Sequence, residues 1–213
     1  FQLKPYPGFE SLERVLRRII HRHESFRTSF HMRDAQPVQQ VHEHVEFILE
    51  TIDTDFDFNR EPGELESVVT SFIRPFKLSA APLFRAAVIE EKEGNNALLL
   101  ADMHHIVSDG TSVEIFRDEL SRLLQGEELP DLEIQYKDFA VWQNRELESE
   151  AVKRQGEYWS ERFRGEIPVL DLPADFPRPA VQSFDGDTLS GQLNAEDCIG
   201  LKKMAVKENA SLY

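Results

Sequence analysis

The sequence is poor in cysteine and has no long apolar run, and each absence excludes a class of protein. Cys198 is the single cysteine among 213 residues, so no disulfide can form within the chain. This usage is typical of a reducing compartment, and we expect a cytoplasmic protein. No stretch approaches the ~18 apolar residues that a membrane-spanning helix needs. We therefore expect neither a disulfide-stabilised secreted domain nor a membrane partner.

Basic residues are also scarce. The chain has 24 Lys and Arg against 39 Asp and Glu, which gives a formal net charge of −15 at pH 7. Proteins that bind the phosphate backbone depend on clustered Lys and Arg, so we expect no nucleic-acid partner. With 40% hydrophobic and 30% charged residues, the composition is that of an ordinary globular protein. The length suits one large domain, or one and a fraction.

The apolar residues follow helical and strand periods in turn, without a regular βαβ alternation. The pattern therefore predicts an α+β fold, an open sheet covered by helices. The proline-rich residues 167–183 predict an extended connector. The first strand and the last helix have no flanking turn or cap, so we expect the chain to begin and stop within a larger fold. The predicted helices are residues 10–23, 64–74, 111–124, 137–147, 152–163 and 195–211, and the predicted strands are residues 1–4, 25–32, 38–41, 45–52, 83–89 and 97–103, with a turn at 34–37.

The strongest local feature is an apolar strand that ends in two adjacent histidines. Successive strand side chains point to opposite faces, so His104 and His105 cannot readily share one metal ion. An imidazole at a strand end suits proton transfer near neutral pH. Asp109 could orient His105, cap the helix that follows, or pair with an arginine. Gly110 permits a positive φ and a close backbone approach. The alternative is a core histidine beside a capping aspartate.

Other candidate sites are weaker. His42 and His44 alternate on a predicted strand, but no third ligand lies nearby in the sequence. Residues 53–57 carry three aspartates that imitate a calcium loop, yet the required glycine and closing glutamate are missing. Ser108 lacks the GxSxG context of a nucleophilic serine. We therefore expect no metal site and no serine nucleophile.

Four motifs together resemble a known family. Residues 104–110 read HHIVSDG and resemble the HHxxxDG motif of condensation domains from nonribosomal peptide synthetases, a signature shared with chloramphenicol acetyltransferase-like acyltransferases and epimerization domains. Residues 22–30, RHESFRTSF, are similar to the family's RHExLRTxF motif. Residues 136–143, YKDFAVWQ, are similar to YxDFAVWQ. Residues 157–159, EYW, with residues 168–175, PVLDLPAD, resemble the family's YW…LPxD stretch.

This resemblance implies a chloramphenicol acetyltransferase-like fold, of which the chain is one half of a V-shaped pseudo-dimer. In that family the active site lies in a tunnel between the two halves. Residues 1–165 would form the N-terminal subdomain and one wall of the tunnel. Residues 166–213 would form the proline-rich connector and the start of the C-terminal subdomain. The family's opening motif and its second subdomain have no counterpart here, so the missing C-terminal half is an expected partner.

The resemblance also assigns roles to the histidine loop. His105 would be the catalytic residue and contact the attacking amine. His104 would pack or hydrogen-bond inward, in a structural role. Gly110 would lie beside the thioester carbonyl and keep the path open. Ser108 is a possible site residue but need not be a nucleophile, because a thioester is already activated.

Further structural roles follow from the same resemblance. Asp109 would point away from the tunnel and pair with Arg22, which would fix the loop. Arg27 would support the same hairpin. Trp159 is a possible site residue, although a tryptophan at a helix end is more often part of the packing.

The implied reaction joins a thioester donor to an amine acceptor and forms an amide. No cofactor would bind directly, since both substrates hang on the phosphopantetheine arms of upstream and downstream peptidyl carrier proteins, with an adenylation domain in the same synthetase. A related HHxxxDG acyltransferase, an epimerization domain and a non-catalytic carrier-docking half-domain stay open. Epimerization domains usually carry a tryptophan-bearing run where Thr111 follows Gly110 here. Basic residues at 14, 17 and 18 could form a docking patch or a solvated helix face.

Overall fold

The computed structural model describes residues 1–53, 62–91, 95–173, 175–177, 179–183, 186 and 189–212. Its internal contacts divide the chain into two compact units, Phe1–Arg162 and Phe163–Tyr213. Asp55 and Asp57 of the rejected calcium loop lie outside the described residues.

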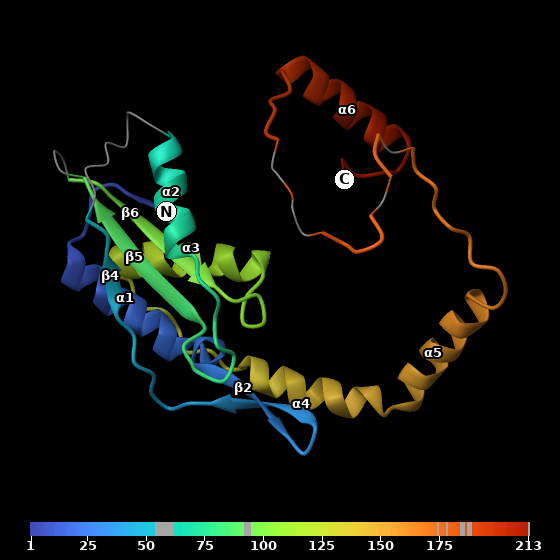
Figure 1. Cartoon of the computed structure of the whole chain (residues 1–213), viewed down its shortest axis with the longest axis horizontal. Coiled ribbons are helices and arrows are strands. Elements are labelled where there is room, and N and C mark those ends of the chain that lie inside the picture. The colour runs from blue at the N-terminus through green and yellow to red at the C-terminus, as the bar shows by residue number, and fades with distance from the viewer. Residues whose placement is uncertain are drawn as a thin grey trace. The chain divides into compact units, whose positions relative to one another are not determined.

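The first unit is built on a four-stranded mixed sheet with the strand order β1-β6-β5-β4 (Figure 1). β1 (Gln2–Leu3) and β5 (Phe84–Glu90) each pair antiparallel with β6 (Ala97–Met103), and β4 (Leu49–Thr51) pairs parallel with β5. The predicted hairpin of β5 and β6 is confirmed. Nearly all of β5 is buried, as its mostly apolar sequence indicates, and Arg85 is buried with it beside Asp102. The strand predicted over residues 45–52 is shorter, because only its end pairs with β5.

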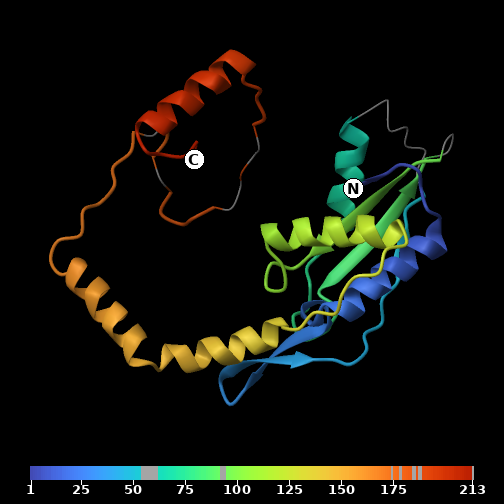
Figure 2. The same ribbon diagram turned by 180° about the vertical axis from the view of Figure 1, so that it is seen from behind.

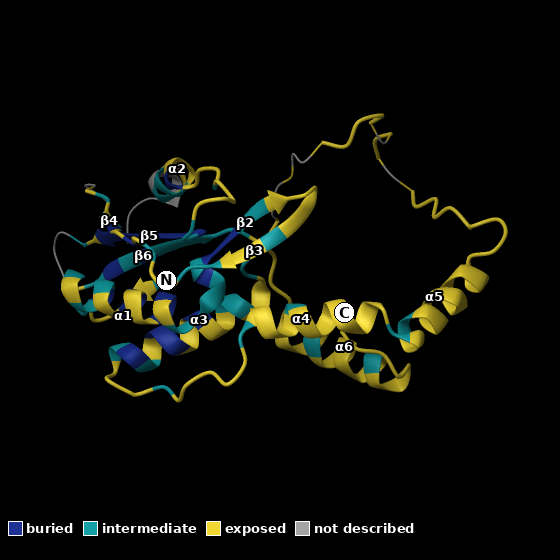
Figure 3. Ribbon diagram, turned by 90° about the horizontal axis from the view of Figure 1, so that it is seen from below, coloured by how far each residue is buried: buried dark blue, intermediate teal, exposed yellow. Residues whose placement is uncertain are grey.

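Helices cover both faces of this sheet (Figure 3). α1 (Phe9–Arg22) and α3 (Gly110–Leu124) lie side by side across one face (Figure 2), and α2 (Pro62–Phe72) lies on the other. The apolar stripe that the spacing predicts for α1 is buried. It packs with the inner residues of α3, β5 and β6 in one hydrophobic core, which fixes both helices against the sheet.

A hairpin of β2 (Thr28–Arg33) and β3 (Gln36–Val41) follows α1. The prediction of a strand from residue 25 is wrong at its start, because residues Glu24–Arg27 form the 3₁₀ helix η1, closed by a 2.7 Å bond from the Thr28 hydroxyl to the carbonyl of Glu24. The hairpin turn is also tighter than predicted. Asp34 and Ala35 both have positive φ, 51° and 61°, as a two-residue hairpin loop requires.

Two further helices, α4 (Tyr136–Leu147) and α5 (Glu150–Arg162), complete the first unit. Both carry mostly exposed side chains (Figure 3). In the second unit the described part of the predicted connector forms neither helix nor strand, and α6 (Ala195–Lys207) follows, capped by Asn194. Among the described residues, no helix combines the length and apolarity needed to cross a membrane.

Candidate functional site

The two histidines lie in a tight loop, residues 104–109, between the end of β6 and the start of α3. The amide of Val107 and the hydroxyl of Ser108 both donate to the carbonyl of His104, at 3.0 and 3.1 Å. The His104 amide donates to the carbonyl of Leu83 at 3.0 Å, which ties the loop to the residue before β5. Apart from this tie to Leu83, bonds among near neighbours shape the 104–109 loop.

The side chain of His104 turns into the protein. Its Nδ1 accepts a hydrogen bond from the Ile106 amide at 3.0 Å, so the neutral ring carries its proton on Nε2. The ring meets the Phe76 ring edge-on, with centroids 6.1 Å apart. This half-buried arrangement agrees with the structural role that the resemblance implies for His104.

The side chain of His105 is exposed and has the opposite tautomer. Its Nδ1 lies 2.6 Å from the carbonyl oxygen of Ser108. Because a carbonyl only accepts, Nδ1 must donate, and the neutral ring keeps a lone pair on Nε2. The backbone of the loop thus prepares His105 to accept a proton at Nε2.

His105 lines a cavity of about 300 Å³ at the end of the sheet. Thr28 and Phe30 contribute to it from β2, Gln39 from β3 and Tyr136 from the start of α4. Ser25, residues 106–109 and Ser112 complete the lining. None of the residues from β2 and β3 was singled out from the sequence, because no local pattern says which hairpin faces the loop.

Asp109 caps α3. Its Oδ1 accepts from the amide and the hydroxyl of Ser112, both at 2.8 Å, and the Asp109 amide donates to the Ser112 hydroxyl at 3.1 Å. The bond from the Ser112 amide, followed by that from its hydroxyl, lowers the pKa of the Asp109 carboxyl below its ordinary value of 3.8. The capping role left open by the residue pattern is therefore the one found.

The expected pair of Asp109 with Arg22 does not form. Asp109 is exposed at the start of α3, whereas Arg22 Nε donates to Glu119 Oε1 at 2.9 Å, farther along the same helix. The physical reason is the capping box, which already satisfies the Asp109 carboxylate. Glu119 was missed, although its place on the buried stripe with Phe116 and Leu120 was a signal: a charge on an apolar stripe needs a partner.

Gly110 is the first residue of α3 and does not use the positive φ that a glycine permits. Asp109 precedes the helix with an extended backbone and makes the turn from the loop into α3, so Gly110 adopts an ordinary helical conformation. A Cβ at Gly110 would meet no described atom within 4 Å. The space beside Gly110 is therefore open in this unit.

Arg27 and Trp159 lie outside the cavity lining. The guanidinium of Arg27 donates to the carbonyls of His42 and His21, the latter at 3.1 Å, and so joins the end of α1 to the end of the hairpin. Trp159 lies on α5 and packs edge-on against Tyr158, with ring centroids 5.2 Å apart. The structure thus gives Arg27 a supporting position. It does not place Trp159 in the lining of the His105 cavity.

A metal site is not built from the described residues, in which no three His, Cys, Asp or Glu side chains cluster suitably. His42 instead bonds through Nε2 to the hydroxyl of Ser29, at 2.7 Å. His44 is exposed beside Glu43.

Comparison with known proteins identifies the family. The sequence-family model named Condensation domain matches residues 1–213, and the chain therefore belongs to the condensation-domain family. Surfactin synthase subunit 1 of Bacillus subtilis (strain 168) is 45% identical over 204 residues, which are 96% of this chain and 6% of the relative. Gramicidin S synthase 2 of Aneurinibacillus migulanus is 45% identical over 203 residues, which are 95% of this chain and 4% of the relative. The chain thus spans a small part of these synthases.

The fold is shared with solved structures. A chain in the complex of the X-domain and OxyB from teicoplanin biosynthesis superposes with a TM-score of 0.78 at 24% identity, covering 99% of this chain and 47% of that one. The predicted α+β class, an open mixed sheet covered by helices, is confirmed. The coverage also agrees with the expectation that this chain corresponds to about half of such a fold.

Proposed function

We propose that this chain is the N-terminal half of a condensation domain that joins a carrier-bound thioester donor to a carrier-bound amine acceptor. The observation that carries the proposal is the bond from His105 Nδ1 to the Ser108 carbonyl, which leaves the Nε2 lone pair available at the cavity. Membership of the condensation-domain family supports the reaction class.

The reaction follows from this arrangement. The amine nitrogen attacks the thioester carbonyl carbon, the carbon–nitrogen bond forms and the carbon–sulfur bond breaks. The proton lost by the amine passes to Nε2 of His105 and then to the leaving sulfur, which departs as the thiol of the phosphopantetheine arm. Ser108 takes no covalent part, which agrees with its hydroxyl being bound to the His104 carbonyl.

Positioning two tethered substrates supplies much of the remaining rate. Orientation of this kind can contribute on the order of 7–11 kcal/mol. The cavity around His105 would be one wall of the reaction site, with open space at Gly110 for the thioester carbonyl. We place the other wall in the C-terminal half, with residues 1–165 as the N-terminal subdomain and residues 166–213 leading out of it.

Substitution of His105 tests this proposal in the complete condensation domain within its synthetase. We expect His105→Ala to slow amide formation between loaded carriers by about 10²–10⁴-fold, the contribution typical of a general base. His44→Ala is the matched control, because that side chain is 80% exposed and remote from the cavity lining. Condensation by His105→Ala at close to the wild-type rate would refute the catalytic role.

A basic groove on α1 supports carrier docking. It encloses about 790 Å³, and its lining combines arginines such as Arg14 and Arg18 with the leucines Leu123, Leu129 and Leu132 and with three acidic residues, Glu10, Glu13 and Asp131. Five arginines line this groove against three acidic residues, in a chain of net charge −15, and this local excess favours a partner with an acidic and apolar surface. We assign this groove to the docking of a peptidyl carrier protein. That carrier protein and the adenylation domain would belong to the same synthetase.

Charge reversal tests the docking surface. We expect Arg14→Glu with Arg18→Glu to weaken binding of a phosphopantetheinylated carrier protein to the chain, most strongly at low salt, where exposed charges are least screened. Arg145→Glu on the exposed side of α4 is the control. Binding without condensation by this chain alone would favour the carrier-docking half-domain. If the wild type, the double variant and Arg145→Glu bind the carrier protein with equal affinity, this groove is not the docking surface.

A further inference from the structure

Glu119 is a buried carboxylate in the second half of α3. Its residue is 7% exposed, and it lies on the stripe that packs against α1. Both oxygens are engaged, since Arg22 Nε donates to Oε1 at 2.9 Å and His23 Nε2 lies 2.6 Å from Oε2. A buried carboxylate with two partners of fixed geometry holds two helices in one relative position.

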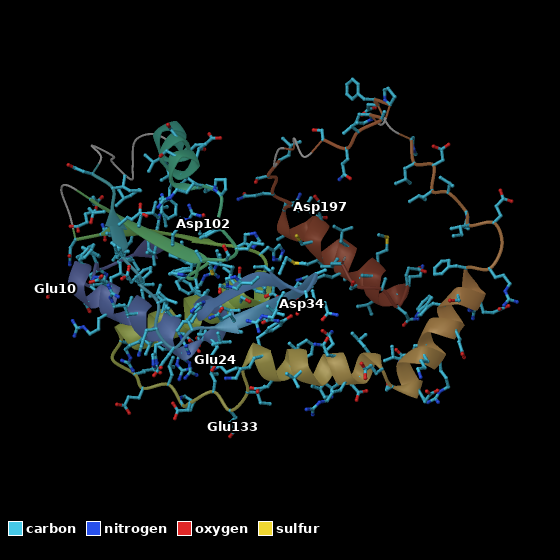
Figure 4. The ribbon with its side chains drawn as sticks, turned by 60° about the horizontal axis from the view of Figure 1, so that its bottom comes forward. Glu10, Glu24, Asp34, Asp102, Glu133 and Asp197 are labelled. Carbon is cyan, nitrogen blue, oxygen red and sulfur yellow. The ribbon has the colours of Figure 1, made fainter. Side chains whose placement is uncertain are left out.

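The same short segment of chain also holds α4. Residues 22–24, which we call the 22–24 junction, comprise the last residue of α1 and the two that follow, and Figure 4 labels Glu24 close to where α4 begins. The Gln135 side chain donates to the carbonyl of Arg22 at 2.9 Å and accepts from the Glu24 amide at 3.1 Å. Lys137 pairs with Glu24 at 2.7 Å. The 22–24 junction therefore ties the end of α1 to α3 and to α4.

The junction lies directly behind the His105 cavity. A second cavity of about 60 Å³ is lined by His23 and by Ser25, Val107 and Ser112. The last three residues also line the His105 cavity. One layer of side chains thus separates the pair of His23 and Glu119 from the space where His105 is exposed.

We infer that Glu119 is a positioning residue for the reaction at His105, an inference that rests on the proposed function. Glu119 lies ten residues after Asp109, about 15 Å along a rigid helix. By fixing the rotation and height of α3 against α1, it sets the place of Ser112 and of the loop that ends at Asp109. A displacement of about 1 Å at a reacting group can cost ~10²-fold in rate.

The test compares two Glu→Gln substitutions on α3, made in the complete condensation domain within its synthetase. Glu119→Gln keeps the size of the side chain but removes the charge that faces Arg22 and His23. Glu114→Gln is the matched control, because its side chain is 68% exposed and pairs only locally with Arg117. At a temperature where circular dichroism shows both proteins folded, we expect Glu119→Gln to lower kcat by about 10- to 100-fold. KM for the loaded carriers changes much less, and Glu114→Gln behaves as wild type.

A conservative variant separates positioning from stability. Glu119→Asp keeps the charge, and we expect it to recover part of the lost kcat. A merely structural Glu119 would lower the melting temperature and leave kcat of the folded enzyme unchanged, and that result would overturn the inference. Where Glu119→Gln does not fold, His23→Ala decides, because it removes the partner of Oε2 and leaves Arg22 on Oε1: a fall in kcat supports the inference and an unchanged kcat overturns it.

The outcomes for the two proposals are distinct. If wild type and Glu114→Gln both fail to condense loaded carriers, the proposed function fails. If both condense and His105→Ala does not, while Glu119→Gln retains the wild-type kcat, the proposed function stands and Glu119 is not a positioning residue.

Discussion

The 104–109 loop and the 22–24 junction border the same small cavity, through Val107 and His23, and they are held in opposite ways. In the loop, the side-chain hydrogen bonds of His104, His105 and Ser108 join residues two to four positions apart, and His105 is exposed. In the junction, the bonds to Glu119 and Gln135 join residues 96 to 113 positions apart, and Glu119 is buried.

The difference separates forming the reactive group from placing it. The bond from His105 to the Ser108 carbonyl lies within the loop, so the loop sets the tautomer of His105 independently of its position in the fold. Its position against the hairpin and α4 depends on the long-range junction, since those elements carry the other walls of the cavity. Substitutions in the junction are therefore expected to act globally, and substitutions in the loop locally.

The largest expected effect on stability comes from Arg22→Ala. The side chains of Arg22 and Glu119 are 16% and 9% exposed, so removal of the arginine leaves a buried carboxylate short of one partner. Breaking a buried pair costs about 3–5 kcal/mol, and we expect the low end because His23 stays beside the other oxygen. Urea unfolding of wild type and variant, followed by circular dichroism, measures the loss.

Arg17→Ala is the control for that measurement. Arg17 lies on the same helix and pairs with Glu13 at 2.8 Å, but its side chain is 49% exposed. An exposed pair four residues apart contributes only about 0.3–0.5 kcal/mol. Equal losses from the two substitutions would contradict the distinction between the buried junction and the helix surface.

The parts of the fold that the sequence predicted well are those that depend on local periodicity. The apolar runs of β5 and β6, separated by a polar turn, and the stripes of α1 and α3 needed only near neighbours for their interpretation. The errors lie where contacts with other segments decide whether a residue joins a strand. The strand ending in β4 extends only as far as β5 offers a partner, and residues Glu24–Arg27 form a 3₁₀ turn in place of a strand.

The same division applies to the candidate site. The sequence located the strand, the two histidines and the aspartate that caps the helix, all within a dozen residues. The family resemblance implied Asp109 as the partner of Arg22, whereas Glu119 is the partner found. Sequence spacing gave no direct measure of that contact, because it joins residues 97 positions apart. The motifs at residues 22–30 and 136–143 contain the wall residues Thr28, Phe30 and Tyr136, but the sequence did not place them at the cavity, for the same reason.

A smaller effect is expected from Asp109→Ala. This substitution removes the cap of α3 but leaves the junction intact, so we expect a loss of stability at most about a third of that from Arg22→Ala. Asp109→Asn should restore it, because asparagine caps equally well. Hydrogen exchange of the Ser112 amide, the donor to Asp109, should become faster in Asp109→Ala. A general rise in exchange that includes β5 would show that the loop is not locally held.

The smallest expected effect is the pH dependence of this cap. Hydrogen bonds from Ser112 lower the pKa of Asp109 in the folded protein, so the carboxylate form is favoured by folding. A lowered folded pKa contributes stability that is fully present above the unfolded value, near 3.8, and is lost as the pH falls through the folded pKa. The difference in unfolding free energy between wild type and Asp109→Asn should therefore be constant from pH 6 to about pH 5 and shift against wild type below pH 3.8. Because Asp109 is exposed, added salt should diminish the change. Denaturant unfolding at a series of pH values measures it, and a difference that does not vary down to the acid limit of folding would mean that the charge of Asp109 contributes nothing to the cap.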